Sequence, residues 1–168
     1  MGYTHYWDKK NGLEGYDKAL PIIKRILERY KDIIAYECDM PDTPAICNEE
    51  MIRFNGIGDD GHETFLFTND AEEFAFCKTA RKPYDVVVCE CLIVLNHFTN
   101  VEISSDGMSG YYEKGMRELS VVQDPDGSWD EAMFNVEQHY DIAYEPICIE
   151  VRDQFYDWEL VEKVKVSS

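Results

Sequence analysis

The chain has 168 residues, of which 45% are hydrophobic and 13% aromatic, and its formal net charge at pH 7 is -18. This length suits a single domain over residues 1–168, and so many aromatic side chains exclude a disordered chain. No apolar run reaches the roughly 18 residues that would cross a bilayer, and no signal-peptide pattern is present. We therefore expect a cytoplasmic protein without a membrane partner, and its acidity disfavours binding to nucleic acid.

The first predicted elements are a strand, a helix and a hairpin. Residues 3–7 form a short segment that is rich in aromatic side chains, which favours a strand. From about Tyr16 to Ile34 the apolar residues recur at helical spacing. Residues 51–57 and 62–67 alternate on either side of a Gly-Asp-Asp-Gly turn, which predicts two antiparallel strands.

The longest apolar stretch, residues 83–98, begins with a proline. Proline is favoured in the first turn of a helix, and sixteen residues exceed an ordinary strand. We therefore predict a buried helix here, with Val87, Cys91 and Leu95 among its buried positions. Residues 101–105 follow as a strand.

The order β-α-β-β-α-β over residues 1–107 predicts an α+β fold. It is the order of the ferredoxin-like (split βαβ) arrangement, an antiparallel sheet with helices on one face. Residues 108–168 form a predicted C-terminal α/β extension. In it, residues 110–122 are predicted to be helical, Ser128 is the predicted N-cap of a further helix, and two strands follow near the end of the chain.

A cationic segment stands out in this acidic chain. FCKTARKPYD, residues 76–85, holds three of the sixteen lysines and arginines: Lys78, Arg81 and Lys82. They precede or join the N-terminus of the predicted helix, where backbone N–H groups favour an anion. Arg81 is suited to bind a phosphate through two parallel hydrogen bonds, and Lys78 is suited to bind it as a point charge. The alternative is that all three form surface ion pairs and that Asp85 alone complements the helix N-terminus.

Polar and aromatic residues near predicted strand ends extend this candidate anion site. Asn55 and Ser105 end two strands, and we predict that they and Tyr84 contact a sugar or base. The aromatic residues of the first strand place rings on both of its faces, so that one face enters the core and the other is able to stack a base. The predicted ligand-binding set is Lys78, Arg81, Lys82, Tyr84, Asp85, Asn55, Ser105, His5 and Trp7.

An alternative function is enzymatic. His62 and His97 each begin a His-x-Thr motif, and paired motifs of this kind act as acid and base in the 2H phosphoesterases. His97, however, falls at the end of the predicted apolar helix, whereas that family carries both motifs on strands. The catalytic candidates are His62, Glu63 and His97.

We expect no metal and no cofactor. The GDDGHE turn contains Asp59, Asp60, His62 and Glu63, but turns collect such residues without an ion. DPDGSWDEA has its glycine in the wrong position for a calcium loop. The six cysteines include no CxxC pair and fit no zinc framework, so we expect free thiols.

A second alternative concerns the acidic segment 124–159, which has eleven acidic residues and one basic residue, Arg152. Such a segment suits docking of a basic protein partner or mimicry of DNA, and it also suits a solvated face.

Four segments together resemble a family of small uncharacterised proteins of tailed phages and bacteria: GYTHYW, IRFNGIGDDGHETF, FCKTARKPYDVVVCECLIVL and VEISSDG. The resemblance covers residues 1–107 in patches and brings no established activity. It implies that the recurring motif residues are His5, Asn55, His62, Glu63, Lys78, Arg81, Lys82, Tyr84, Asp85 and Ser105.

From these observations we expect a protein that binds, and so sequesters, a small phosphate-bearing ligand such as a nucleotide or nucleotide-derived signal. A phage origin, which the resemblance implies, favours a counter-defence role in the host cytoplasm. Homo-oligomerisation is compatible with the sequence. The alternatives are a phosphodiesterase that uses His62 and Glu63, and an acidic interaction or DNA-mimic protein.

Overall fold

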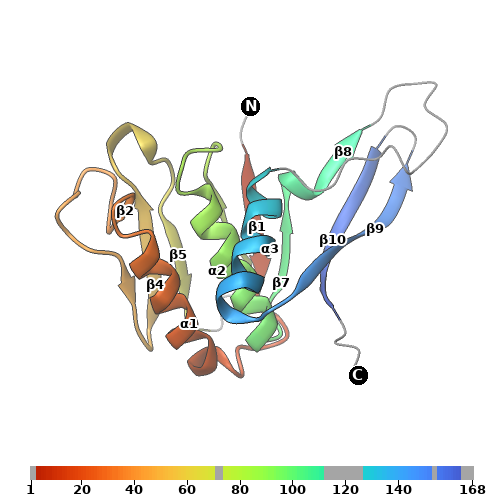
Figure 1. The fold of residues 1–168 in the computed structure, drawn as a ribbon, viewed down its shortest axis with the longest axis horizontal. Helices are drawn as coiled ribbons and strands as arrows, with labels where there is room; N and C mark the ends of the chain where they lie inside the picture. Colours follow the sequence, from red (N-terminus) through yellow and green to blue (C-terminus); the bar gives the residue numbers. More distant parts are fainter. Residues whose placement is uncertain (1–2, 71–73, 112–126, 153–154, 164–168) are drawn as a thin grey trace.

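The computed structural model describes residues 3–70, 74–111, 127–152 and 155–163 (Figure 1). Helices and antiparallel strands are both present, which confirms the α+β class. None of the helices in these ranges is long and apolar enough to cross a membrane.

The strand β1 (Thr4–Asp8) is the centre of a three-stranded antiparallel sheet. It pairs on one side with β6 (Phe74–Lys78) and on the other with β7 (Glu102–Ser105). In this register His5 is opposite Cys77 and Ser105. Because side chains alternate between the two faces of a strand, His5 and Trp7 point toward the core and Tyr6 points away from it.

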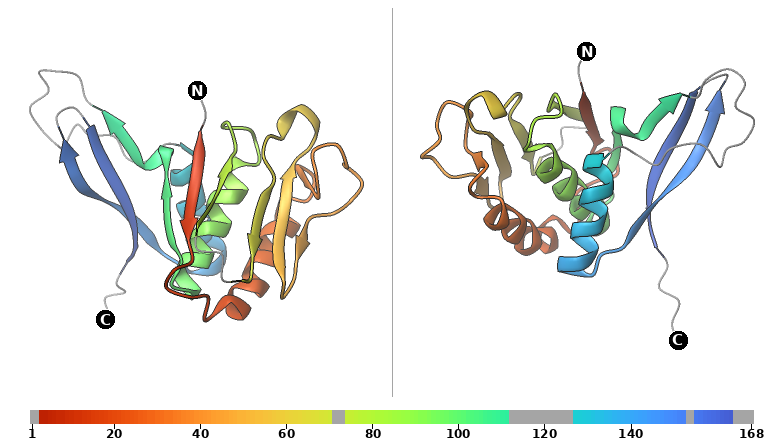
Figure 2. Two further views of the ribbon diagram at one scale, coloured as in Figure 1. Left: turned by 180° about the vertical axis from the view of Figure 1, so that it is seen from behind. Right: turned by 45° about the horizontal axis from the view of Figure 1, so that its top comes forward.

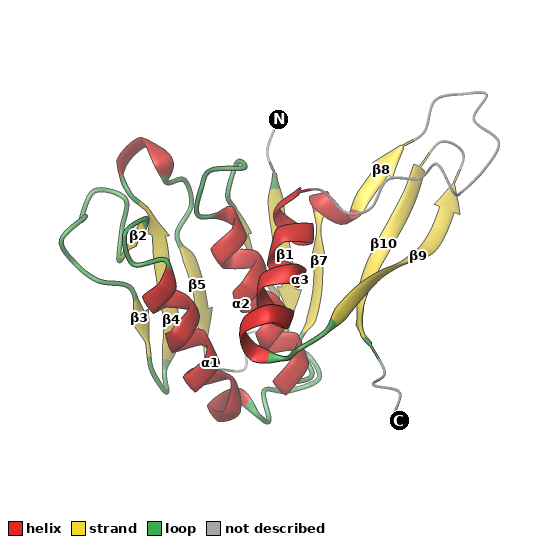
Figure 3. Cartoon of the chain, in the orientation of Figure 1, coloured by secondary structure: helices red, strands yellow, loops and turns green. Residues whose placement is uncertain are grey.

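A second sheet is built around β4 and lies beside the first (Figure 3). Its strands are β2 (Ile34–Ala35), β3 (Ile46–Cys47), β4 (Met51–Gly56) and β5 (Phe65–Thr68). The pairing of β4 with β5 around a 3-10 turn confirms the predicted hairpin. The Glu63 N–H donates to the Lys78 carbonyl at 3.1 Å, which brings β5 next to β6.

The helices α1 (Tyr16–Arg29) and α2 (Asp85–Phe98) cover one face of the strands, and α3 (Gly127–Tyr140) packs against α2. Every residue of α2 from Asp85 to Leu95 is buried, which confirms the predicted central helix. Gly15 precedes α1 with a φ of 98°. A Cβ there would lie 1.9 Å from the Phe98 carbonyl oxygen, so only glycine allows α1 and the end of α2 to approach this closely.

The C-terminal strands form a third sheet in the order β8-β10-β9, which projects away from the helices (Figure 1). Its members are β8 (Ser109–Tyr111), β9 (Tyr144–Arg152) and β10 (Phe155–Glu162). The predicted helix 110–122 therefore begins in a strand, and residues 112–122 lie outside the described ranges. The predicted cap Ser128 lies one residue inside α3, because the helix begins at Gly127.

The ferredoxin-like arrangement is not confirmed. That arrangement has two strands between its helices, whereas β2, β3, β4, β5 and β6 all lie between α1 and α2. The predicted order has no strand at β6, because its phenylalanines Phe74 and Phe76 are exposed and its sequence lacks the alternation of apolar and polar residues that predicts a half-buried strand.

Candidate functional site

Several chain segments meet at one edge of the first sheet. The ends of β4, β6 and β7 lie there, together with the first turns of α2 and α3, at the top of Figure 1. The segment between β6 and α2 is the cationic segment, and the polar residue that ends β7 is Ser105. The structure therefore brings together most of the residues predicted from the sequence.

The centre of this edge is a buried hydrogen-bonded chain of three side chains. His5 Nε2 lies 2.5 Å from Asp85 Oδ1, and His5 Nδ1 lies 2.6 Å from Ser105 Oγ. The exposed fractions are 0% for His5, 2% for Asp85 and 6% for Ser105. Thr79 Oγ1 donates to the same Asp85 oxygen. We call these four residues, with Trp129, the His5 cluster.

The hydrogen bonds of Ser105 determine the tautomer of His5. Ser105 Oγ accepts from Trp129 Nε1 at 3.0 Å and from the Gly107 N–H at 3.0 Å. Both lone pairs of the hydroxyl are then used, so its hydrogen is directed to His5 Nδ1. This arrangement leaves a proton on His5 Nε2, from which it is donated to Asp85. Ser105, His5 and Asp85 resemble a serine–histidine–aspartate triad. The Ser105 hydroxyl, however, is buried beneath Trp129, so its role is structural.

The Asp85 carboxyl is held in its ionised form. Burial raises its pKa, but the interactions with His5 and the hydrogen bonds of Ser128 and Thr79 lower it by more, so the pKa lies below its ordinary value. Its second oxygen, Oδ2, is buried and has no hydrogen-bond partner of ordinary geometry among the described residues, although the Ser128 side chain is close enough to lower the pKa. Asp85 also lies in the first turn of α2, where a negative charge is favourable.

His5, Asp85 and Cys89 offer a nitrogen, an oxygen and a sulfur within 4.8 Å of one another. This donor set would suit zinc, but a metal needs the lone pair of His5 Nε2, which carries the proton. Two ligands that share one zinc ion also lie about 3.3 Å apart, farther than the observed separation of nitrogen and oxygen. The geometry is that of a hydrogen bond, and we assign no metal here.

The loop that carries the cations has an unusual backbone. Ala80 has a φ of 52° and Arg81 a φ of 58°, both in the left-handed region that residues other than glycine rarely adopt. The N–H groups of Thr79 and Ala80 both bond to the Tyr3 carbonyl, which holds the loop in place. Each such residue costs on the order of 1–3 kcal/mol, and strain of this kind is concentrated at functional loops.

The three cations differ in their surroundings. Arg81 is exposed, and its guanidinium lies 4.0 Å from the centre of the Tyr3 ring. Lys78 and Lys82 are half-buried. Within the described ranges neither lysine ammonium forms an ion pair. Among the described residues, the alternative explanation by surface ion pairs therefore finds no partner for these two lysines.

Asn55 and Tyr84 hold the edge together through their side chains. Asn55 is 1% exposed, and its amide accepts from the Gly56 and His62 N–H groups and donates to the His62 carbonyl and Thr64 Oγ1. The Tyr84 ring is buried and its hydroxyl donates to the Glu63 carbonyl at 2.6 Å. Neither side chain offers a free polar group or an open ring face to a ligand.

One of the three catalytic candidates, His97, lies far from the other two. His62 is exposed, and the carboxylate of its neighbour Glu63 accepts from the Lys78 backbone N–H at 2.8 Å. His97 lies at the far end of α2, 3.0 Å from Glu162. The fourteen residues of α2 span about 20 Å, so His62 and His97 do not face one substrate.

The predicted aromatic contacts His5 and Trp7 are both buried. Trp7 is 1% exposed and packs against Phe65 and Phe67, with ring centres 5.1 and 6.1 Å away. Its ring therefore lies in the core. The residues that the sequence does not single out are Thr79 and Trp129 in the His5 cluster and Cys89 beside it, together with Phe74 and Phe76 on β6.

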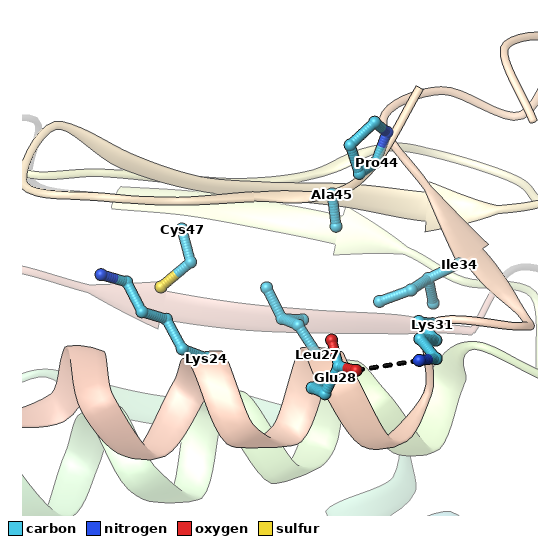
Figure 4. A pocket seen from close by; sticks show the side chains of 8 residues that line it. All are labelled: Lys24, Leu27, Glu28, Lys31, Ile34, Pro44, Ala45 and Cys47. Atoms are coloured by element: carbon cyan, nitrogen blue, oxygen red, sulfur yellow. Dashed lines mark hydrogen bonds and ion pairs between the residues drawn. The ribbon is translucent and has the colours of Figure 1, made fainter. Parts of the chain in front are cut away.

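A separate pocket of about 260 Å³ lies between α1 and the strands β2 and β3 (Figure 4). Lys24 and Lys31 stand at its two ends, and Lys31 is paired with Glu28. Cys47 lines it, and burial raises the pKa of its thiol to about 11, so the thiol is protonated near neutral pH. None of the residues predicted to bind a ligand lines this pocket.

Comparisons of the chain with protein-family models, with curated proteins and with solved structures gave no match. The resemblance to the phage and bacterial family rests on its motifs and stays a prediction.

Proposed function

We propose that this protein binds, and so sequesters, a small phosphate-bearing ligand at its cationic edge, which we define as residues 78–82 with the first turn of α2. The proposal rests on the surroundings of the Lys78 and Lys82 ammonium groups. In a chain of net charge -18 these two ammonium groups form no ion pair with the described residues. Cations that have no carboxylate partner among the described residues of so acidic a protein are suited to an anionic ligand.

The surroundings of the loop support an anionic ligand. The N-terminal turns of α2 and α3 lie at the same edge, and the partial positive charge of helix N-termini favours phosphate. The side chain of Arg81 over Tyr3 is the natural bidentate partner for a phosphate group. The strained backbone at Ala80 and Arg81 fits a loop that is shaped for a ligand and not for stability.

The His5 cluster has a supporting role in this proposal. It ties Thr79 of the cationic loop to β1 through His5, and to the end of β7 through Ser105. A loop that must select one ligand needs such a rigid base, because ordering a mobile loop would consume binding free energy. We therefore treat His5, Asp85 and Ser105 as positioning residues.

Binding of inorganic pyrophosphate, measured by isothermal titration calorimetry, tests the proposal. We expect Arg81→Ala to weaken binding by about 1.5–3 kcal/mol, the contribution of a charged hydrogen-bond partner. The control is Lys31→Ala, which removes an exposed cation already paired with Glu28 and should leave the affinity unchanged. Equal affinities in wild type, Arg81→Ala and Lys78→Ala would contradict a site at this edge.

Two alternatives stay predictions. A phosphodiesterase needs His62, so loss of product formation with retained binding in His62→Ala would favour that enzyme over a sequestering protein. The acidic interaction surface predicted at 124–159 includes residues 124–126 and 153–154, which lie outside the described ranges, while α3 presents Glu131 and Glu137 to solvent. A counter-defence role in an infected host follows from the family resemblance alone.

A further inference from the structure

The sheet β6-β1-β7 has one face that the described helices leave open. Figure 2, on the left, shows the strands in front of the helices α1, α2 and α3. Side chains of alternate residues on each strand project from this face. It therefore presents a surface whose composition is set by every second residue of three strands.

Three aromatic rings gather on the open face. Phe74 and Phe76 on β6 are 54% and 55% exposed, although Phe side chains are usually buried. Tyr6 on β1 stacks on Phe74 with ring centres 6.1 Å apart, and the Phe74 and Phe76 ring centres are 6.4 Å apart. A single exposed Phe, such as Phe134 on α3, needs no explanation, but a contiguous set of exposed rings marks a binding surface.

The register of the strands orders the charges around these rings. Tyr6 lies opposite Phe76 and Ser104 in the central row. One row toward the cationic edge is Lys78, two residues or about 7 Å along β6 from Phe76.

On the opposite side of the rings the charges are negative. Asp8 lies opposite Phe74 and Glu102, and Glu102 pairs with Lys10 at 3.3 Å. Asp106, which accepts a hydrogen bond from the Tyr6 hydroxyl, follows Ser105 and lies at the other end of the face, in the row of Thr4 and Lys78. The face thus has Lys78 and Asp106 at one end and Asp8 and Glu102 at the other, with the aromatic rings between them.

We infer that this face is a stacking platform for the base of a free nucleotide, with Tyr6, Phe74 and Phe76 under the base and Lys78 directed to the phosphate. This inference rests on the proposed phosphate binding and names the ligand class. Aromatic rings on the face of a sheet stack nucleobases of any identity, since every base has a π-face. The exposed Ser104 hydroxyl lies in the same row as Tyr6 and Phe76 and offers a hydrogen bond to the ligand.

The charge pattern favours a free nucleotide over a nucleic-acid strand. A strand would carry further phosphates past Asp8 and Glu102 at one end or past Asp106 at the other, where like charges repel them. The face also does not suit a second copy of the chain, because each copy would bring a net charge of -18 and the same carboxylates to the interface. A single nucleotide fits this platform, because its phosphate lies at Lys78 while its base lies on the rings.

Adenosine 5′-monophosphate and ribose 5-phosphate form a matched pair of probes, because they share the sugar and phosphate and differ by the base. Isothermal titration calorimetry with the full chain should show the monophosphate binding about tenfold or more tightly. Phe76→Ala should remove this advantage and leave the affinity for ribose 5-phosphate unchanged. Phe134→Ala, a matched loss of an exposed Phe, should change neither affinity, whereas Lys78→Ala should weaken both.

The possible failures are distinguishable. If neither probe and no pyrophosphate binds, the proposed phosphate site is wrong and the platform with it. If both probes bind equally, the phosphate site holds and the stacking inference is overturned. Tighter binding of a short oligoadenylate than of the monophosphate, lost in Phe76→Ala, would replace the free nucleotide by a strand. A dimer in sedimentation that Phe76→Ala dissociates would replace it by a second copy.

Discussion

His5 and Asp85 are eighty residues apart in the chain, and His5 Nε2 donates a hydrogen bond of 2.5 Å to Asp85 Oδ1 in the interior of the protein. This contact joins the first strand to the first turn of the central helix. Together with the bond from His5 to Ser105 it ties β1, β7 and α2 to one another at the cationic edge.

The contact predicts a large loss of stability when the imidazole is removed. His5→Ala should lower the free energy of unfolding by about 3–5 kcal/mol, because it leaves the buried Asp85 carboxylate without its main partner. Urea denaturation followed by tryptophan fluorescence measures the change. His139→Ala is the control, since His139 is exposed on α3 and its loss should stay within about 0.5 kcal/mol. A similar small loss in both variants would show that the contact contributes little.

The lowered pKa of Asp85 predicts how the free energy of unfolding changes in acid. Its pKa is lower in the folded protein than its ordinary value of 3.8, so the unfolded chain binds the proton more readily. The stabilisation is present above pH 3.8 and is lost as the pH falls through the folded pKa. Denaturation curves between pH 6 and pH 3 should fall less steeply with acid in Asp85→Asn than in wild type. Parallel curves would contradict the assignment of an ionised Asp85.

Glu90 should show the opposite dependence on pH. Burial between the helices raises the pKa of its carboxyl, although Tyr30, Arg29 and Asn135 donate to it and lower the pKa in part. The folded protein therefore holds the Glu90 proton at pH values where the unfolded chain has lost it, and the stability that Glu90 contributes falls as the pH rises from 4.5.

The measurement is the difference in free energy of unfolding between wild type and Glu90→Gln, which removes the titration and keeps the shape. We expect the free energy of unfolding of the wild type to fall relative to that of Glu90→Gln as the pH is raised from 4.5, until Glu90 is fully ionised. A difference that is constant with pH would mean that the carboxyl titrates normally in the fold.

Asn55 predicts a loss of stability without a direct contact to the ligand. Its amide makes four hydrogen bonds that close the turn from Gly56 to Thr64. Asn55→Ala should cost about 1–3 kcal/mol, since it leaves buried backbone groups unpaired. Pyrophosphate affinity, measured well below the melting temperature, should change only a few-fold. A loss of affinity as large as that of Arg81→Ala would place Asn55 in contact with the ligand.

The sequence by itself was sufficient for elements whose signal is local. The helix α2 was predicted because an apolar run of this length that begins with proline fits few other structures, and its Val87, Cys91 and Leu95 are buried as expected. The hairpin of β4 and β5 followed from alternation around a glycine-rich turn. The cationic segment was visible because three cations in five positions contrast with the charge of the whole chain.

Only the tertiary structure decided which face of each strand is buried and which distant residues meet. Alternation shows that the neighbours His5 and Tyr6 point to opposite sides of the sheet, but whether a side faces helices or solvent depends on where α1 and α2 pack. For this reason His5 belongs to a buried cluster, while Tyr6 joins the open aromatic face with Phe74 and Phe76. The hydrogen bonds from His5 to Asp85 and to Ser105 join residues that are eighty and a hundred positions apart. They arise from strand pairing and helix packing, which the local sequence does not reveal.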